Sequence, residues 1–205
     1  MPAATPAFVC SMEAVLDVYA RPYDANNPVV GLDESPRQLI SELRTGFVCS
    51  DGVEHYDYEY RREGVADLCM IIEPLAGRRE VLVRDNHDRL SYGRALIYIA
   101  EVMYPNAARI TIIEDNHSAH KLSALYELLE PERARSIIQR LEIVRTPVHG
   151  SWLNVAELEF SVLRRQGLPT RVPSRDDCER LVRLWTEQRN INSKKIDWQF
   201  TTADA

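Results

Sequence analysis

The chain has 205 residues, of which 45% are hydrophobic and 27% are charged, and it contains no low-complexity tract. A chain of this size buries enough apolar surface to fold as one ordinary domain, so it is neither disordered nor fibrous. Its 25 lysines and arginines and 31 aspartates and glutamates give a net charge of −6. A net negative charge excludes a protein that binds nucleic acid through an overall positive charge. It does not exclude a catalytic domain that acts on nucleic acid through metal ions.

The cysteines and the apolar segments indicate a cytoplasmic protein. Cys10, Cys49, Cys69 and Cys178 are too far apart in sequence for a Cys-x-x-Cys metal site or redox pair, so we expect reduced, space-filling thiols. The sequence has no run of 18 apolar residues and no signal peptide, so we expect no membrane partner. We interpret residues 1–205 as a single domain, with residues 1–22 as an N-terminal helix that leads into it.

The spacing of apolar residues predicts the secondary structure. Helical spacing shows apolar residues three and four apart, and strand spacing shows alternation or a short apolar run. In the first half, the predicted elements are a helix over 8–20, strands over 28–33, 54–63, 65–74 and 80–84, and a helix over 91–104. In the second half, they are a strand over 109–115, helices within 121–140 that break at Pro131, a strand over 141–145, a helix from 151–154 to 163, and a helix from Ser174. This order predicts a mixed α/β domain in which an antiparallel meander precedes alternating helices and strands.

Three acidic residues stand at positions where such a domain gathers its chemistry. Asp33 ends the first predicted strand, Asp115 ends the strand over 109–115, and Glu157 lies early in the helix that follows the strand over 141–145. Ligand sites in open sheets form at strand ends. Three converging carboxylates repel one another, and hard divalent cations neutralise them. Two Mg²⁺ ions about 4 Å apart would activate a water or hydroxyl and stabilise the leaving oxygen of a phosphodiester. Each acid taken alone is more typical of a solvated surface carboxylate.

Polar residues around these acids strengthen the metal interpretation, and they carry a family resemblance. The three blocks are VVGLDESPRQLI, IIEDNHSAHK and TPVHGSWLNVAELEFSVLRRQGL. They resemble the acidic blocks of bacterial insertion-sequence transposases of the six-thirty group, which is related to the mariner transposases and shares their DDE catalytic core. The stretch YDYEYRREGVADLCMIIEPLAGRREVLV and the tail DWQFTTADA are also similar to that group. The resemblance implies a ribonuclease H-like fold with a central mixed five-stranded sheet, an antiparallel meander plus parallel strands, flanked by helices.

The resemblance also implies roles for individual residues. Asp33, Asp115 and Glu157 would be the catalytic, metal-binding set for two Mg²⁺ ions, with Mn²⁺ as a substitute. Glu159 is the rival of Glu157, but the family spacing Asn-x-x-Glu fits Asn154 and Glu157. Residues two apart on a helix point about 200° apart, so Glu157 and Glu159 cannot face one metal pair.

Further residues are assigned to supporting roles. Strand alternation points Glu34 and Glu114 away from the aspartates beside them, so both are structural or lie behind the metal ligands. Trp152 is a core residue or a lid over the site, with stacking on DNA as the alternative. The residues expected behind the ligands or in contact with phosphate are Asn116, His120 and Asn154. The weaker candidates for DNA binding are Lys121, Arg164, Arg165, Lys194 and Lys195.

The resemblance implies DNA as partner, both element ends and target, with a homodimer in the active complex, bound to the nucleoid of a bacterial cytoplasm. Relatives carry helix-turn-helix segments ahead of the core, and we expect this chain to be a core that lacks them. From Ser161 onward, nine basic and six acidic residues give +3, which leaves −9 for the first 160 residues. This distribution disfavours recognition of terminal repeats by this chain alone.

Three functions stay open at this point. The first is Mg²⁺-dependent hydrolysis and strand transfer at element ends. The second is a truncated, non-cleaving remnant that associates with an intact transposase, although such a remnant would have no reason to keep all three acids. The third is a ribonuclease H-like nuclease with another nucleic acid substrate. An aspartyl-phosphate receiver or phosphatase would need a nucleophile motif such as Asp-x-Asp near the first strand, which the sequence lacks.

Overall fold

The computed structural model describes residues 5–204, apart from residues 44–46, 49, 51, 53, 56 and 57. The strands are β1 (Val29–Glu42), β2 (Phe47–Val48), β3 (Glu54–His55), β4 (Tyr60–Glu73), β5 (Arg78–Arg84), β6 (Ile110–Glu114) and β7 (Leu141–Arg145). The α-helices are α1 (Pro6–Tyr19), α2 (Arg89–Tyr98), α3 (Ala124–Leu128), α4 (Pro131–Arg140), α5 (Val155–Gln166) and α6 (Arg175–Ile191). A π-helical turn, η1 (Ile99–Met103), extends α2, and short 3₁₀ turns are η2 (Ser151–Leu153) and η3 (Thr202–Asp204).

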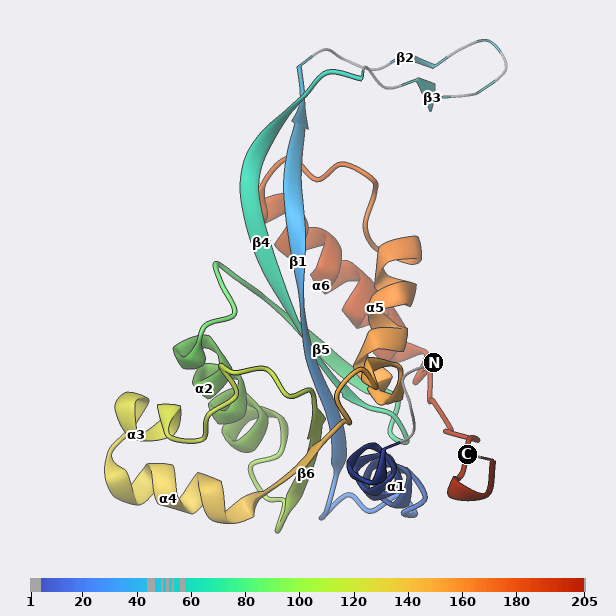
Figure 1. The fold of residues 1–205 in the computed structure, drawn as a ribbon. Helices are drawn as coiled ribbons and strands as arrows, with labels where there is room; N and C mark the ends of the chain where they lie inside the picture. Colours follow the sequence, from blue (N-terminus) through green and yellow to red (C-terminus); the bar gives the residue numbers. More distant parts are fainter. Residues whose placement is uncertain are drawn as a thin grey trace.

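A five-stranded sheet in the order β5-β4-β1-β6-β7 forms the centre of the molecule (Figure 1). β5, β4 and β1 pair in antiparallel fashion, whereas β1, β6 and β7 are parallel. The prediction of a mixed sheet with an antiparallel meander and parallel strands is therefore confirmed. β2 and β3 form a separate two-stranded ribbon.

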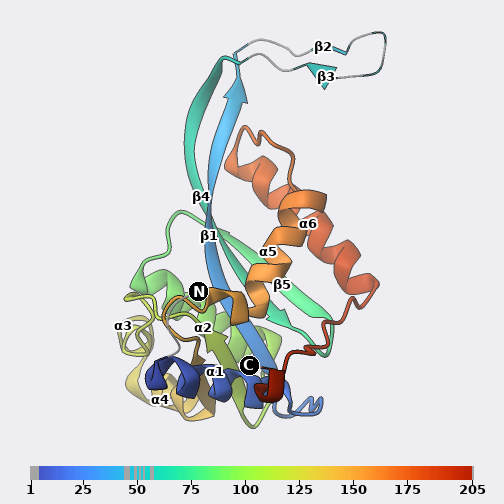
Figure 2. The same ribbon diagram turned by 45° about the vertical axis from the view of Figure 1, so that its right-hand side comes forward.

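Helices cover both faces of this sheet, with α5 and α6 on one side and α2, α3 and α4 on the other (Figures 1 and 2). Each face has its own apolar core. Side chains alternate along β1, so Val30 and Leu32 join the core under α2, whereas Leu39 joins the core under α5. This alternation determines which face of the sheet each polar residue of β1 can reach.

β1 is much longer than the strand predicted over 28–33. β6 pairs with β1 only from Val29 to Gly31, and β1 then continues beside β4 as far as Glu42. The two strands extend together beyond the helical layers (Figure 2). The prediction that Asp33 ends its strand was therefore wrong, because it is the parallel neighbour that ends there. Pro36 is accommodated because β1 has no partner on that side among the described strands, so a missing N–H group breaks no ladder.

The strand predicted over 54–63 is not a separate element either. Glu54 and His55 belong to β3, residues 56 and 57 lie outside the described residues, and Tyr60–Glu63 form the start of β4. The break that the sequence indicates at Gly64 is a β-bulge, where the pairing with β1 shifts and Gly64 adopts a φ of 109°. A bulge at glycine lets β4 run through the point where two separate strands were predicted.

The helix predictions are confirmed in position. Pro131 begins α4, and Ser174 caps α6 by accepting a hydrogen bond from the Asp177 N–H at 3.1 Å. Asp88 caps α2 through the Ser91 N–H at 2.7 Å, so that helix begins two residues earlier than predicted. Cys10, Cys69 and Cys178 are free thiols as expected, and Cys49 lies outside the described residues. Within the described ranges, no helix is both long and apolar enough to cross a membrane.

Candidate active site

Asp33 lies on β1 at the level where the parallel part of the sheet ends. The last pair between β1 and β6 is Gly31 with Ile113, so the same register places Asp33 level with Asp115, the residue that follows β6. Gly31 lies two residues before Asp33 on the same face, and a Cβ there would lie 2.6 Å from Val155 Cγ1 of α5. Asp33 therefore faces the start of α5, next to the end of β6.

The three predicted acids influence one another electrostatically. Burial raises the pKa of Asp33 to about 7, and the charges of Glu157 and Asp115 contribute to that shift. A hydrogen bond from the Glu34 N–H to Asp33 Oδ1, 2.9 Å long, opposes it in part. Since like charges act on a carboxyl group only at short range, acids from β1, the loop after β6 and α5 share one region. This is the grouping that the sequence predicts.

Asp115 lies at the beginning of a loop whose shape its own carboxylate helps to set. Its Oδ1 accepts a hydrogen bond from the His117 N–H at 2.9 Å, and the side chain is 41% exposed. The next residue, Asn116, donates from Nδ2 to the carbonyl oxygen of Thr146 at 2.5 Å. The loop after β6 is thereby joined to the segment that follows β7, and Asp115 keeps one face open to solvent.

Glu157 owes its place to Asn154, which caps α5. Asn154 Oδ1 accepts from the Ala156 N–H at 3.1 Å, and Nδ2 donates to the carbonyl oxygen of Leu32 at 2.9 Å. Asn154 is fully buried. The first turn of α5, which carries Glu157, is therefore attached to the residue that precedes Asp33.

Glu159 has a different and structural environment. Its carboxylate is 1% exposed, lies 3.3 Å from Arg79 Nε and forms a second ion pair with Arg189. Arg79 is itself buried, so this cluster joins β5, α5 and α6 within the protein. With both carboxylate oxygens paired to guanidinium groups, Glu159 is not available to the acids on the other side of α5.

His120 lies at the centre of a buried polar cluster on the other face of β1. Its Nε2 lies 3.0 Å from Glu34 Oε2, and its Nδ1 lies 3.2 Å from Asp115 Oδ1. The ring stacks on Tyr92, whose hydroxyl donates to Glu114 at 2.8 Å. Burial lowers the pKa of His120, but the hydrogen bond and charge of Glu34, with Glu114 and Asp115, outweigh it and raise that pKa.

Comparison with known proteins identifies the family. A family model described as DDE superfamily endonuclease matches residues 28–179, well over half of the chain, and spans Asp33, Asp115 and Glu157. The chain belongs to the DDE superfamily endonucleases. No curated protein matches this sequence.

The DDE chain shares its fold with solved complexes of the Mos1 transposase. The mariner Mos1 paired end complex with Mg superposes with a TM-score of 0.61 at 14% identity, covering 96% of this chain and 59% of that chain. The paired end complex with Mn gives 0.59 at 14%, with 95% and 61% covered, and the Mos1 strand transfer complex gives 0.58 at 15%, with 91% and 56% covered. The predicted ribonuclease H-like fold is confirmed, and the chain spans about three fifths of the length of these structures.

The donor set of the DDE chain fits hard divalent cations in charge and in kind. Carboxylate oxygens are the ligands that Mg²⁺ and Mn²⁺ prefer, and a cation would relieve the repulsion that raises the pKa of Asp33. Over the described ranges, no three His, Cys, Asp or Glu side chains are close enough to hold one ion jointly. The charges of Glu157 and Asp115 therefore act on Asp33, but the three side chains must move closer together to coordinate a common ion.

The basic residues predicted to contact DNA lie in different places. Arg164 of α5 donates to Ser35 Oγ at 2.6 Å, and Ser35 is two residues from Asp33 on the same face of β1. Lys194 instead lies at the β4–β5 turn, where its carbonyl accepts from Arg79 at 2.5 Å, and Lys195 follows it. Arg165 and Lys121 are exposed. Of these five residues, Arg164 is the one that the described contacts connect to the strand of Asp33.

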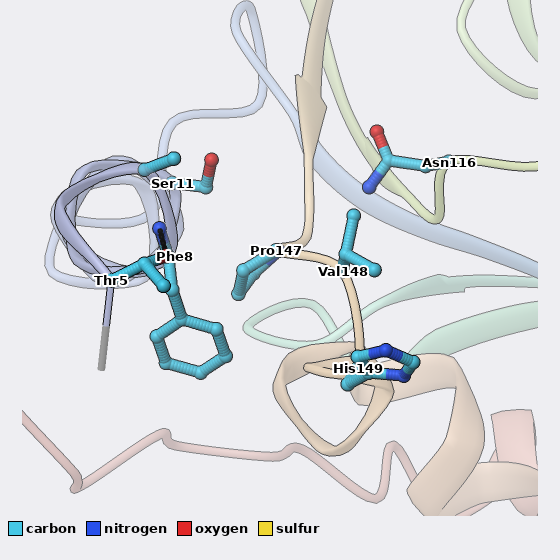
Figure 3. A pocket seen from close by; sticks show the side chains of 8 residues that line it. Thr5, Phe8, Ser11, Asn116, Pro147, Val148 and His149 are labelled. Carbon is cyan, nitrogen blue, oxygen red and sulfur yellow. Dashed lines mark hydrogen bonds between the residues drawn. The ribbon is translucent and has the colours of Figure 1, made fainter. Parts of the chain in front are cut away.

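A hollow of about 430 Å³ opens beside the Asp115 loop (Figure 3). Asn116 lies on one side and Phe8 of α1 on the other, with Pro147 and Val148 between them, and His149 also lines the hollow. His149 has a φ of 65°, a left-handed conformation that non-glycine residues rarely adopt. Trp152 is not a core residue: it is 47% exposed and its ring packs edge-on against Phe200 of the C-terminal tail at 5.6 Å.

Sequence reasoning placed His120 near Asp115 but did not identify its other partners. Nothing local to Tyr92, a buried residue on α2, indicates that its ring stacks on His120. The same holds for Arg145 at the end of β7, which donates to the His120 carbonyl oxygen at 3.1 Å. The expectation that Glu34 points away from Asp33 is consistent with its contact with His120. The pattern indicated the face of Glu34 but not its partner, because the pairing depends on tertiary structure.

Proposed function

We propose that the DDE chain is the catalytic core of a DNA transposase of the six-thirty insertion-sequence group, which hydrolyses a phosphodiester at an element end and joins the 3′-hydroxyl to target DNA. Asp33, Asp115 and Glu157 are its metal-binding residues. The observation that carries this proposal is the raised pKa of Asp33, because two of its causes are the charges of Glu157 and Asp115. The family match over residues 28–179 includes all three acids, which supports the proposal.

Each residue has a role that follows from its place. Asp33 on β1 and Asp115 after β6 would hold the divalent ions, and Glu157 in the first turn of α5 would hold one of them. When bound, two such ions supply Lewis acidity to the attacking and leaving oxygens. Asn154 fixes the helix that presents Glu157, through its bond to the Leu32 carbonyl. Asn116 fixes the Asp115 loop through Thr146.

DNA contact is proposed for the surface beside these acids. Arg164 emerges next to Ser35 and offers a guanidinium to a DNA phosphate near the proposed metal site. Lys121, Arg165, Lys194 and Lys195 are weaker candidates for non-specific phosphate contact. The similarity to complexes of Mos1 with transposon ends supports DNA as the partner. A homodimer in the active complex and action at the nucleoid in a bacterial cytoplasm stay predictions from the sequence resemblance.

The test is cleavage of plasmid DNA in Mg²⁺ or Mn²⁺ by the wild-type chain and by Asp115→Asn. We expect the variant to lose metal-dependent nicking and to keep its circular dichroism spectrum and melting temperature, because the Asp115 side chain is 41% exposed. Asp197→Asn, which removes an exposed carboxylate from the C-terminal tail, is the matched control and should nick normally. Wild-type cleavage by Asp115→Asn would end the proposal.

The same assay separates the two alternatives. A remnant that only associates with an intact transposase would show no metal-dependent cleavage even of pre-nicked element ends. A ribonuclease H-like nuclease would cleave an RNA–DNA hybrid in preference to duplex DNA. The proposed transposase core should instead act on DNA and produce joined as well as nicked products.

A further inference from the structure

Leu32, Asp33 and Glu34 are consecutive residues of β1, and together they connect the segments that carry the proposed metal ligands. The carbonyl oxygen of Leu32 accepts from Asn154, which caps the helix of Glu157. Asp33 is a ligand itself. The carboxylate of Glu34 points to the opposite face and lies 3.0 Å from His120 Nε2. Figure 1 shows β1 passing between α5 on one side and α2 on the other, so this strand reaches both layers.

The contact between Glu34 and His120 is enclosed. The His120 side chain is 1% exposed and that of Glu34 is 11% exposed. Tyr92 stacks on the imidazole with ring centroids 4.5 Å apart, which restricts rotation of the ring. Both ring nitrogens have carboxylate neighbours, Glu34 at Nε2 and Asp115 at Nδ1. A ring held in this way has one orientation in which it reaches both acids.

His120 connects this enclosed contact to Asp115. Its Nδ1 lies 3.4 Å from the backbone carbonyl oxygen of Asp115 and 3.2 Å from Asp115 Oδ1, the oxygen that also accepts from the His117 N–H. Among the described residues, no protein donor bonds to the other carboxylate oxygen of Asp115, whose side chain is 41% exposed. The imidazole therefore holds one oxygen of Asp115 and leaves the other for a ligand.

We propose that Glu34 and His120 are positioning residues, which hold the carboxylate of Asp115 at a fixed distance from β1 so that it meets Asp33. This inference rests on the proposed metal site and deepens it. Glu34 adjoins Asp33 in sequence, so the strand that presents one ligand also anchors the other. Partners behind metal ligands typically change metal affinity by about 10–100-fold when removed, because the ligand loses its orientation.

The first experiment measures Mn²⁺ binding to the full chain by isothermal titration calorimetry. We expect Glu34→Ala and His120→Ala each to weaken Mn²⁺ binding by about 10–100-fold. The double variant should be no weaker than the weaker single variant, because the two residues act in series. Glu34→Gln, whose side-chain oxygen still accepts from His120, should recover part of the affinity. Loss of folding alone would not produce this recovery.

The matched control is Glu73→Ala. Glu73 is also a buried carboxylate of the sheet, 4% exposed, and it accepts from the Tyr104 hydroxyl at 2.9 Å. It is the last residue of β4, three residues beyond Met70, which pairs with Asp33, and its described hydrogen bond is to Tyr104 and not to a proposed ligand. We expect a loss of thermal stability without a change in Mn²⁺ affinity.

The second experiment needs no metal. The ¹³C carboxyl resonance of Asp115, assigned by comparison with Asp115→Asn, should shift in Glu34→Ala and stay unchanged in Glu73→Ala. An unchanged resonance in folded Glu34→Ala, or Mn²⁺ affinity within twofold of wild type, would overturn the positioning role. If wild-type protein binds no Mn²⁺, the proposed function fails, and the resonance alone decides whether Glu34 positions Asp115.

Discussion

Asn154 and Leu32 are joined by a hydrogen bond of 2.9 Å that runs from the side chain of one to the backbone carbonyl of the other. The same Asn154 side chain caps α5 through the Ala156 N–H. One buried amide therefore fixes both where α5 begins and how far it lies from β1. Gly31 makes this approach possible, since a Cβ there would lie 3.3 Å from Asn154 Oδ1.

We predict that Asn154→Ala lowers the free energy of unfolding by roughly 2–4 kcal/mol, because it removes a helix cap and leaves the Leu32 carbonyl without its donor. It should also abolish metal-dependent cleavage, since Glu157 would no longer be held beside β1. Denaturant unfolding and the nicking assay measure the two effects. Ser174→Ala, which removes only the cap of α6, should cost about 1 kcal/mol and leave cleavage intact. Normal cleavage by folded Asn154→Ala would contradict the role assigned to the bond.

Glu157 and Glu159 should respond in opposite ways to the same substitution. Glu159→Gln breaks buried ion pairs with Arg79 and Arg189, and we expect it to destabilise the fold by about 3–5 kcal/mol. Glu157→Gln removes a charge that repels Asp33, so stability in the absence of metal should be unchanged or higher. Cleavage and stabilisation by Mn²⁺ should be lost in Glu157→Gln. Thermal melts with and without Mn²⁺ compare the two variants, and the reverse pattern would exchange their assigned roles.

Stability should depend on pH through Asp33. Its pKa rises from 3.8 in the unfolded chain to about 7 in the fold, first because of burial. Between about pH 4 and pH 7 the folded protein keeps a proton that the unfolded chain has released, so this group makes stability fall as pH rises, by on the order of 1 kcal/mol per pH unit. Without metal, Asp33→Asn should gain stability relative to wild type across that window.

Added Mn²⁺ should reverse this trend in the wild-type protein. Binding needs an ionised Asp33, so the thermal shift caused by Mn²⁺ should be larger at pH 8 than at pH 5.5. Asp33→Asn should show no such shift at either pH. An equal Mn²⁺ shift in Asp33→Asn would place the ion elsewhere.

Tyr19 should matter for the start of α5. Its buried hydroxyl donates to the carbonyl oxygen of Leu153 at 2.8 Å and accepts from the Val155 N–H at 3.0 Å. Tyr19→Phe leaves both backbone groups unpaired, and we expect a loss of about 2 kcal/mol in denaturant unfolding. Tyr126→Phe, at a tyrosine that is 46% exposed, should be neutral. Equal stabilities of the two variants would show that other groups satisfy the backbone around η2.

The sequence was sufficient for most of the element order, because it depends on local patterns. The apolar run of β6, Pro131 at the start of α4 and the Ser174 cap of α6 are local signals, and the structure follows them. The grouping of Asp33 with Asp115 could be inferred because parallel strands end at the same edge of a sheet. The charges of Glu157 and Asp115 contribute to the raised pKa of Asp33, which is consistent with this inference.

Other features could not be predicted, because they depend on contacts with segments that are distant in the sequence. The length of β1 beyond Asp33 is set by β4, and Pro36 in the middle of the strand argues against it locally. Gly64 is as typical of a turn as of a bulge, and only the pairing partner decides between them. The stacking of Tyr92 on His120 joins α2 to the loop after β6, and neither segment carries a signal for the other.

The adjacency of Asp33 and Glu34 has a consequence for how this gene can change. Successive residues of a strand point to opposite layers, so one codon inserted or deleted between Gly31 and Asp33 would exchange the faces to which Asp33 and Glu34 point. Asp33 would then point toward the His120 cluster, and Glu34 would face α5. A substitution changes one side chain of β1, whereas a change of length in this short stretch reverses every side chain that follows it.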